Sequence, residues 1–101
     1  MSSCAKGANH PPRLFEIGAL KFSTDIQRIM DEGRLDPMPF FLRYMRGDWG
    51  EVADYRWREN NAALQSGGRL ESFYTVHREL ALSIVTEADR SATLIRASFE
   101  R

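Results

Sequence analysis

The chain has 101 residues, 43% of them hydrophobic and 28% charged, which is enough apolar sequence for one globular domain with a modest core. Fourteen basic residues balance fourteen acidic ones, so no whole-chain field draws the protein to a polyanion or to a membrane surface. All basic residues except Lys6 and Lys21 are Arg, a bias that reflects either bidentate anion recognition or coding composition.

Cys4 is the only cysteine, which excludes an internal disulfide and a cysteine-based metal cluster within one chain. Such a composition suits a reducing cytoplasm. No stretch approaches the roughly 18 apolar residues of a transmembrane helix, and residues Met1–Pro12 lack the apolar run of a signal peptide. We therefore expect a cytoplasmic protein with no membrane partner.

The first thirteen residues, Met1–Arg13, contain Ser, Gly, Asn and a Pro pair, and they predict a disordered leader before a single domain at residues 14–101. Order is expected to begin at Leu14. The next apolar residues have an imperfect period of two around Gly18, which predicts a short strand with a bend or bulge. These residues are Phe15, Ile17, Ala19, Leu20 and Phe22.

Two helices are predicted next. Ser23 or Thr24 fits an N-cap, and Gly33 fits the end of the first helix. The second helix is expected from Pro37 to Arg46, because Asp36-Pro37 is a typical helix start and Gly47 a typical left-handed stop. Apolar residues at i, i+3, i+4 and i+7 predict the buried face of this second helix. They are Met38, Phe41, Leu42 and Met45.

A third, surface helix is predicted over residues 51–65, where apolar positions are sparse and Gly67-Gly68 follows. After it, Leu70–Val76, Leu80–Thr86 and Ala92–Phe99 are rich in β-branched and aromatic residues. Their short connections favour an antiparallel meander. The predicted fold class is therefore α+β: a short N-terminal strand, two to three helices, and a three-stranded antiparallel β-meander packed on the helices. The first strand is expected to join the sheet at one edge.

The most polar connection is Gly47-Asp48-Trp49-Gly50, here called the GDWG turn. A carboxylate in such a turn can accept hydrogen bonds from exposed amides at the start of the following helix. We expect Asp48 to cap the amides of Glu51 and Val52, and Trp49 to pack under the turn.

A second polar connection, Thr86–Ser91, reads Thr-Glu-Ala-Asp-Arg-Ser and is here called the TEADRS segment. Both polar connections carry more polar groups than a plain turn needs, and buried polar groups need partners. We therefore expect the two connections to lie close together, with Asp89 or Arg90 reaching the GDWG turn.

The carboxylates and amides of these segments also allow a metal-site interpretation. Asp48, Asp54, Asn60 or Asn61, Glu87 and Asp89 would then form an acidic cluster for a divalent cation. That cluster would make the protein a small metal-dependent hydrolase or nuclease. The spacing from Asp48 to Asp54 matches no metal-binding loop, so we predict no catalytic residues, no metal ligands and no cofactor.

Aromatic and Arg side chains allow a third interpretation, a stacking platform for single-stranded nucleic acid. Aromatic residues at helical and strand spacing are more often part of the core, and the chain has no basic excess, so RNA binding is the less favoured alternative. The platform would comprise Tyr44, Tyr55, Trp57, Phe73 and Tyr74, flanked by Arg43, Arg46, Arg56, Arg58 and Arg69.

Three strings carry a resemblance: R-Y-M-R-G-D-W-G, R-E-N-N-A-A-L-Q-S-G-G-R-L-E-S-F-Y and I-V-T-E-A-D-R-S-A-T. Together they resemble a group of small proteins encoded on plasmids and other mobile elements, often labelled only plasmid-related. The resemblance spans roughly Phe41 to Ile95. The group has a His where this chain has Tyr44, and a Leu-Leu-Pro string where it reads Leu94-Ile95-Arg96-Ala97. The resemblance implies a mobile-element setting and supplies no activity.

Small size, neutral charge and the missing catalytic constellation favour a binding protein, carried by mobile DNA, that occupies a surface on a host- or plasmid-encoded protein. The target class would be a host defence complex, giving an anti-defence role, or a plasmid-maintenance complex. Aromatic and Arg anchors on the third helix are expected to matter more than Asp48 or Asp54. The predicted binding residues are Asp48, Trp49, Asp54, Tyr55, Arg56, Trp57, Arg58, Glu87, Asp89 and Arg90.

Overall fold

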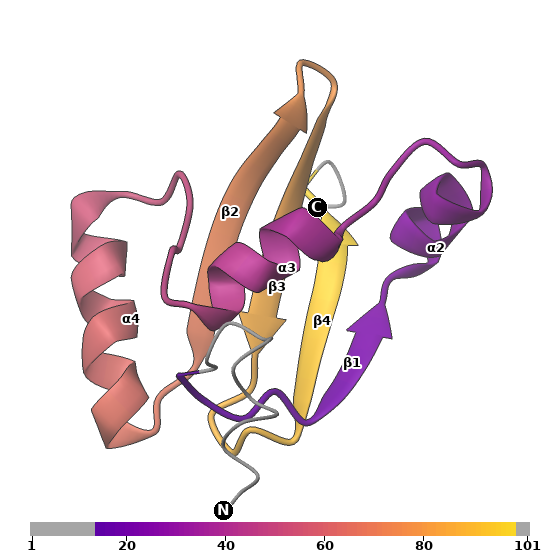
Figure 1. The fold of residues 1–101 in the computed structure, drawn as a ribbon. Coiled ribbons are helices and arrows are strands. Elements are labelled where there is room, and N and C mark those ends of the chain that lie inside the picture. The colour runs from indigo at the N-terminus through magenta and orange to yellow at the C-terminus, as the bar shows by residue number, and fades with distance from the viewer. Residues whose placement is uncertain (1–13, 99–101) are drawn as a thin grey trace, which may run out of the picture.

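The computed structural model describes residues 14–98, so the predicted leader lies outside the described residues. Its elements in chain order are β1 (Ala19–Phe22), α2 (Thr24–Asp31), α3 (Met38–Met45), α4 (Asp54–Ser66), β2 (Leu70–His77), β3 (Leu80–Thr86) and β4 (Ala92–Ala97). The predicted α+β class and the order of its elements are confirmed (Figure 1). No helix within this range is both long and apolar enough to span a membrane.

The four strands form one mixed sheet in the order β1-β4-β3-β2. β2, β3 and β4 are the predicted antiparallel meander, and β1 joins the edge by running parallel to β4. β1 is shorter than expected, because Phe15 and Ile17 precede it and the chain turns at Gly18, where φ is +63°. A Cβ at Gly18 would overlap the carbonyl oxygen of Ser91, so this close approach requires glycine.

Helices α2 and α3 begin and end largely as their sequences indicate. Ser23 caps α2, since its Oγ accepts a hydrogen bond from the Ile26 amide at 3.2 Å. At the end of α3, the Gly47 amide donates to the Tyr44 carbonyl and the Asp48 amide to the Arg43 carbonyl. This pair of bonds is a Schellman motif, and it depends on the left-handed φ of +87° at Gly47.

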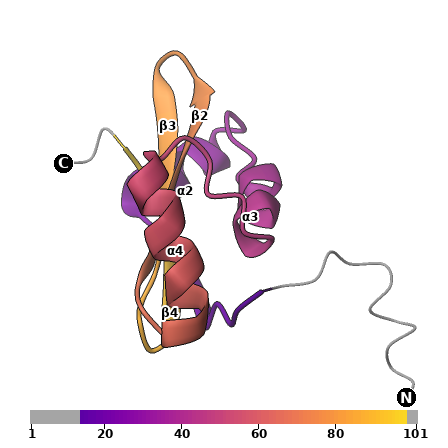
Figure 2. The same ribbon diagram turned by 90° about the vertical axis from the view of Figure 1, so that its left-hand side faces the viewer.

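The three helices occupy different places around the sheet (Figures 1 and 2). α3 lies across one face, α4 lies beside the β2 edge, and α2 lies on the β1 side. The core forms between α3, α2 and this face of the sheet, and α4 adds Ala63 to it. Its buried members are Ile26, Ile29, Phe41, Tyr44, Trp49, Ala63, Leu70, Tyr74, Leu80, Leu82, Ile84, Ile95 and Ala97.

The predicted buried face of α3 is wrong in detail. Phe41 is buried, but Met38 is 43% exposed, and Leu42 and Met45 are only half-buried. Tyr44 is fully buried instead. The helix turns Tyr44 toward the sheet because a large ring contributes much apolar area and its hydroxyl finds a partner there, a possibility that apolar spacing alone does not register.

Candidate functional site

The GDWG turn lies along the outer edge of β2 like a fragment of a fifth strand. The Phe73 amide donates to the Trp49 carbonyl at 3.3 Å, and the Glu51 amide donates to the Phe73 carbonyl at 2.7 Å. Between these two bonds, Gly50 forms a parallel β-bridge with Phe73. The turn therefore fixes the loop before α4 directly onto the sheet.

Two side chains, those of Asn60 and Glu51, make further hydrogen bonds to the backbone along the same edge of β2. The Asn60 side chain is buried, its Nδ2 donates to the Glu71 carbonyl at 2.7 Å, and its Oδ1 accepts from the Glu71 amide at 3.3 Å. The Glu51 carboxylate accepts from the Thr75 amide at 3.1 Å and from the Thr75 hydroxyl at 2.6 Å. The outward amides of Glu71, Phe73 and Thr75 thus each have a partner, which keeps other chains from adding to this part of the edge.

Asp48 stabilises the turn in a different way from the one predicted. It does not cap Glu51 and Val52; it accepts from Arg43 Nε at 2.8 Å and from the Gly50 amide at 3.1 Å. The N-cap of α4 is Ala53, because the chain is still bonded to β2 at residue 51 and the helix begins only at Asp54. The hydrogen bond from Arg43 holds the pKa of Asp48 below its usual value.

Trp49 packs under the turn as predicted, with no exposed surface. Its Nε1 donates to Asn61 Oδ1 at 2.9 Å, and its ring meets the Tyr44 ring edge-on at 5.4 Å. Trp49 therefore holds the turn between α3 and α4 and has no surface with which to contact a partner.

Arg90 does not reach the GDWG turn, contrary to the prediction that the two polar connections meet through it. Its guanidinium donates to the Gly68 carbonyl at 2.6 Å and to the Ala63 carbonyl at 3.0 Å, at the end of α4. The Ala63 carbonyl also accepts from the Gly67 amide at 2.9 Å. Carbonyls at the C-terminal end of a helix carry partial negative charge, so they attract a cation. Asp89 accepts from the Ser91 amide within its own turn.

A buried chain of hydroxyl groups links α3 to the sheet. Tyr44 donates to Thr86 Oγ1 at 2.7 Å, Thr86 and Thr93 lie 2.7 Å apart, and Thr93 donates to the Ile17 carbonyl at 2.8 Å. Because Thr93 gives its proton to Ile17, Thr86 is the donor to Thr93. Burial raises the pKa of Tyr44 well above its usual value, which keeps its hydroxyl protonated as the first donor.

Replacing Tyr44 by Phe is expected to lower the free energy of unfolding by about 1 to 2 kcal/mol, because Thr86 loses its donor in a buried place. Tyr55→Phe is the matched control, since the Tyr55 side chain is 55% exposed; it should change stability by less than about 0.5 kcal/mol. Urea denaturation followed by circular dichroism measures both. Equal stabilities of the two variants would show that the hydroxyl chain contributes nothing.

The acidic cluster of the alternative metal-site interpretation does not form among the described residues. Across residues 14–98, no three His, Cys, Asp or Glu side chains are grouped to hold a metal ion. The reason is that the proposed ligands are engaged elsewhere: Asp48 with Arg43, Asp89 with Ser91, and Asn60 with the backbone of Glu71.

The aromatic platform is also not assembled on the surface. Tyr44 and Tyr74 are fully buried, and Tyr74 donates to the Asp48 carbonyl at 2.6 Å. Trp57 is half-buried against the core cluster, so Tyr55 is the exposed aromatic of the five. Tyr44 and Tyr74 belong to the core because the large rings of α3 and β2 face each other across the same layer. Phe73 is half-buried and lines a groove where α4 begins beside β2.

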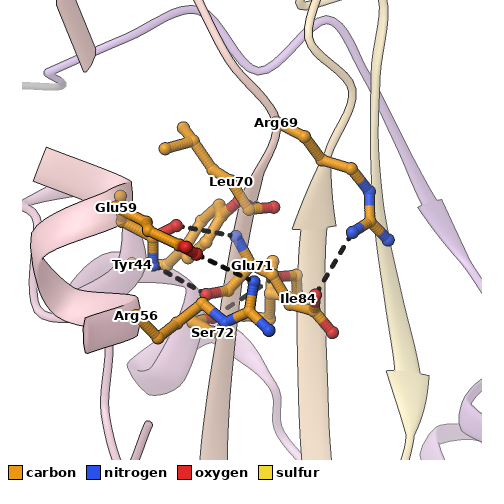
Figure 3. A network of polar contacts seen from close by, with 9 residues as sticks. Tyr44, Arg56, Glu59, Arg69, Leu70, Glu71, Ser72 and Ile84 are labelled. Atoms are coloured by element: carbon orange, nitrogen blue, oxygen red, sulfur yellow. Dashed lines mark hydrogen bonds and ion pairs between the residues drawn. The ribbon is translucent and has the colours of Figure 1, made fainter. Parts of the chain in front are cut away.

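A groove of about 240 Å³ opens where α4 begins beside β2. Tyr55 and Arg56 line it from α4, and the Arg56 guanidinium lies 5.6 Å from the centre of the Tyr55 ring. Arg56 also pairs with Glu59 at 3.4 Å, and Glu71 on the opposite wall pairs with Arg69 at 3.2 Å (Figure 3). The lining residues are Glu51, Val52, Ala53, Tyr55, Arg56, Glu71, Ser72, Phe73 and Ser83.

The groove brings together only part of the predicted binding set. Tyr55 and Arg56 line it, and Asp54 and Arg58 are exposed on the same helix. Glu87 and Asp89 are exposed in the TEADRS segment. The groove walls Val52, Glu71 and Ser83 were not predicted as binding residues. Strand alternation is the signal that places Glu71 and Ser83 on the face opposite the core, but nothing in the sequence brings α4 beside them.

Comparison with protein-family models, with curated proteins and with solved structures gives no match for this chain. Its function is therefore inferred from its own contacts and exposed side chains.

Proposed function

We propose that this chain is a small binding protein that acts through protein–protein interaction. The interaction surface is the exposed part of α4 beside the groove, here called the α4 surface and made of Asp54, Tyr55, Arg56 and Arg58. The observation that best supports it is Tyr55, whose large side chain is 55% exposed at the groove. Tyr and Arg are enriched among residues that dominate binding energy at interfaces.

The geometry of the α4 surface favours an anchor role for Tyr55. A tyrosine ring offers a large rigid contact area at a low cost in conformational entropy. The Arg56 guanidinium beside this ring restricts it further, and the half-buried Val52 and Phe73 provide an apolar wall next to it. A partner side chain that enters the groove would thus be enclosed on two sides.

The proposed partner is a host- or plasmid-encoded protein of the cytoplasm, in a defence or plasmid-maintenance complex. The resemblance to mobile-element proteins supports this setting. The competing role, a metal-dependent hydrolase, would need carboxylates that are free to bind an ion. Asp48 instead accepts three hydrogen-bonding contacts from Arg43 and Gly50, which supports a structural role for it.

Replacing Tyr55 by Ala is expected to reduce partner capture by about thirtyfold, the effect of losing roughly 2 kcal/mol at an interface anchor. Met38→Ala is the matched control, because Met38 is a large apolar side chain exposed on α3, away from the groove. Affinity purification from the native host, quantified by mass spectrometry, compares wild type with both variants. Equal capture by wild type and Tyr55→Ala would contradict the proposal.

Calorimetry with magnesium, manganese and zinc separates the binder from the hydrolase. If Asp89→Asn abolished micromolar metal binding while leaving partner capture intact, the hydrolase would be the better interpretation.

A further inference from the structure

The groove beside Tyr55 contains a carboxylate that neutral groups hold in place. Glu51 lines the groove and is exposed, and each of its carboxylate oxygens accepts a hydrogen bond from Thr75. The Thr75 hydroxyl donates at 2.6 Å and the Thr75 amide at 3.1 Å. An ionised carboxylate has about four acceptor positions. Glu51 therefore keeps acceptor capacity on both oxygens, in an orientation that is already fixed.

The Glu51 carboxylate stays ionised in this environment. The hydrogen bonds from the Thr75 hydroxyl and amide lower the pKa of Glu51 below its usual value. The charge of Arg43 lowers it further, but the Arg43 guanidinium is itself paired with Asp48 at 2.8 Å. Because Thr75 is uncharged, it orients the negative charge of Glu51 without neutralising it.

The other charged side chains that line the groove have counter-ions of their own. Arg56 pairs with Glu59 at 3.4 Å, and Glu71 pairs with Arg69 at 3.2 Å (Figure 3). Within residues 14–98, Glu51 forms no ion pair. The carboxylate with a fixed position is therefore also the charge of the groove that is not matched.

The remaining surfaces of the groove fit the rest of a long cationic side chain. Val52 and Phe73 are half-buried apolar residues of the lining, and they can cover a methylene stem. The Tyr55 ring is largely exposed and can receive a cation on its face. Arginine suits these neighbours better than lysine, because its planar guanidinium stacks on aromatic rings and donates two parallel hydrogen bonds to a carboxylate.

We infer that the groove binds an arginine side chain of the protein partner, with its guanidinium on Glu51 and its methylene stem on Val52 and Phe73. The inference rests on the proposed function, because it names the group that enters the groove. Charge decides between the possible occupants. Glu51 would repel an acidic side chain, and an apolar side chain would cover the charge of Glu51 without giving it a partner, which is costly.

NMR titration of the isotope-labelled full chain with Nα-acetyl-arginine amide tests the inference directly. We expect the amide signals of Val52, Tyr55 and Phe73 to shift in a saturable way, with a Kd on the order of 1 mM for so small a ligand. Nα-acetyl-citrulline amide is the matched probe, because its side chain has nearly the same shape and no charge. It should produce no saturable shift over the same concentrations.

Glu51→Gln is expected to weaken binding of the arginine amide about fivefold, the effect of losing one exposed charge pair. The Gln side chain can accept from the Thr75 amide and donate to the Thr75 hydroxyl oxygen, so the substitution removes the charge and retains both contacts. Glu79→Gln is the matched control, since Glu79 is exposed between β2 and β3 and does not line the groove. It should leave the Kd unchanged.

The inference would be overturned if the arginine amide showed no saturable binding, if the arginine and citrulline amides bound equally well, or if Glu51→Gln kept wild-type affinity. If Glu51→Gln lost its circular dichroism signal, the salt dependence of the wild-type chain would decide. Added salt should weaken binding of the arginine amide, and binding that salt left unchanged would contradict a charge pair.

Partner capture by Tyr55→Ala distinguishes this inference from the proposed function. Reduced capture by Tyr55→Ala, together with no binding of the arginine amide, would leave the α4 surface as the interface and reject arginine as its ligand. Unchanged capture by Tyr55→Ala, together with binding of the arginine amide that depends on Glu51, would contradict the proposed function and leave arginine recognition by the groove intact.

Discussion

Replacing Gly50 by Ala is expected to destabilise the protein by about 3 kcal/mol or more. The left-handed conformation of Gly50, with φ of +78°, costs any other residue about 1 to 2 kcal/mol. In addition, a Cβ at this position would overlap the Phe73 carbonyl oxygen and lie 2.6 Å from Cδ1 of Tyr74. Relieving that overlap would cost roughly 1 to 3 kcal/mol, and it would pull the GDWG turn away from β2.

Gly67→Ala is the control for this prediction. Gly67 has a similar φ of +85°, but no atom lies within 4 Å of the place where its Cβ would be. Gly67→Ala should therefore destabilise the protein only by the cost of a left-handed conformation in a residue other than glycine, about 1 to 2 kcal/mol. Thermal and urea denaturation of both variants measure the difference. If the two substitutions cost the same, close packing of Gly50 on β2 would not matter.

Replacing Asn60 by Asp is expected to cost about 3 kcal/mol at neutral pH, the second largest effect. The substitution removes the Nδ2 donor and places a carboxylate oxygen against the Glu71 carbonyl, in a side chain that is 1% exposed. Asn61→Asp is the matched control, because the Asn61 side chain uses its oxygen to accept from Trp49 and a carboxylate retains that acceptor.

The cost of Asn60→Asp should depend on pH, and the direction follows from linkage. Burial and the facing carbonyl raise the folded-state pKa of the new Asp above its unfolded value of about 3.9. The protonated carboxyl group can again donate to the Glu71 carbonyl. The stabilisation from this hydrogen bond is fully present below the pKa of the unfolded state, and it is lost as the pH rises through the pKa of the folded state. Stability curves of wild type and variant should converge toward pH 4. A constant difference between pH 4 and pH 8 would contradict this assignment.

The sequence predicted most of the fold because local signals and tertiary packing agree in most elements. Glycine at the ends of helices and β-branched runs after Arg69 are local features, and the structure confirms them. The buried face of α3 was wrong because Tyr44 satisfies its hydroxyl on Thr86, 42 residues further along the chain. A helical periodicity contains no information on such a distant partner.

The candidate site was less predictable for the same reason. Asp48, Asn60 and Arg90 were recognised as polar residues that need partners, but their partners lie on elements whose placement the sequence does not specify. Asp48 turned back to α3, Asn60 reached the edge of β2, and Arg90 reached the end of α4. Tyr55 and Trp57 were both expected as exposed aromatic anchors of the third helix; Tyr55 is 55% exposed, whereas Trp57 is half-buried. The groove beside Tyr55 depends on how α4 lies against β2.

The parallel pairing of β1 with β4 has a consequence for biosynthesis. Ala19 pairs with Ala92 and Phe22 with Ile95, so the ribosome makes β1 long before its partner exists. During that interval β2 and β3 can form their hairpin, because their pairing is local. Leu20 and Phe22 must wait until β4 has left the exit tunnel. The sheet can therefore be completed only after β4 has been made, and the nascent chain carries an unpaired hydrophobic strand until then.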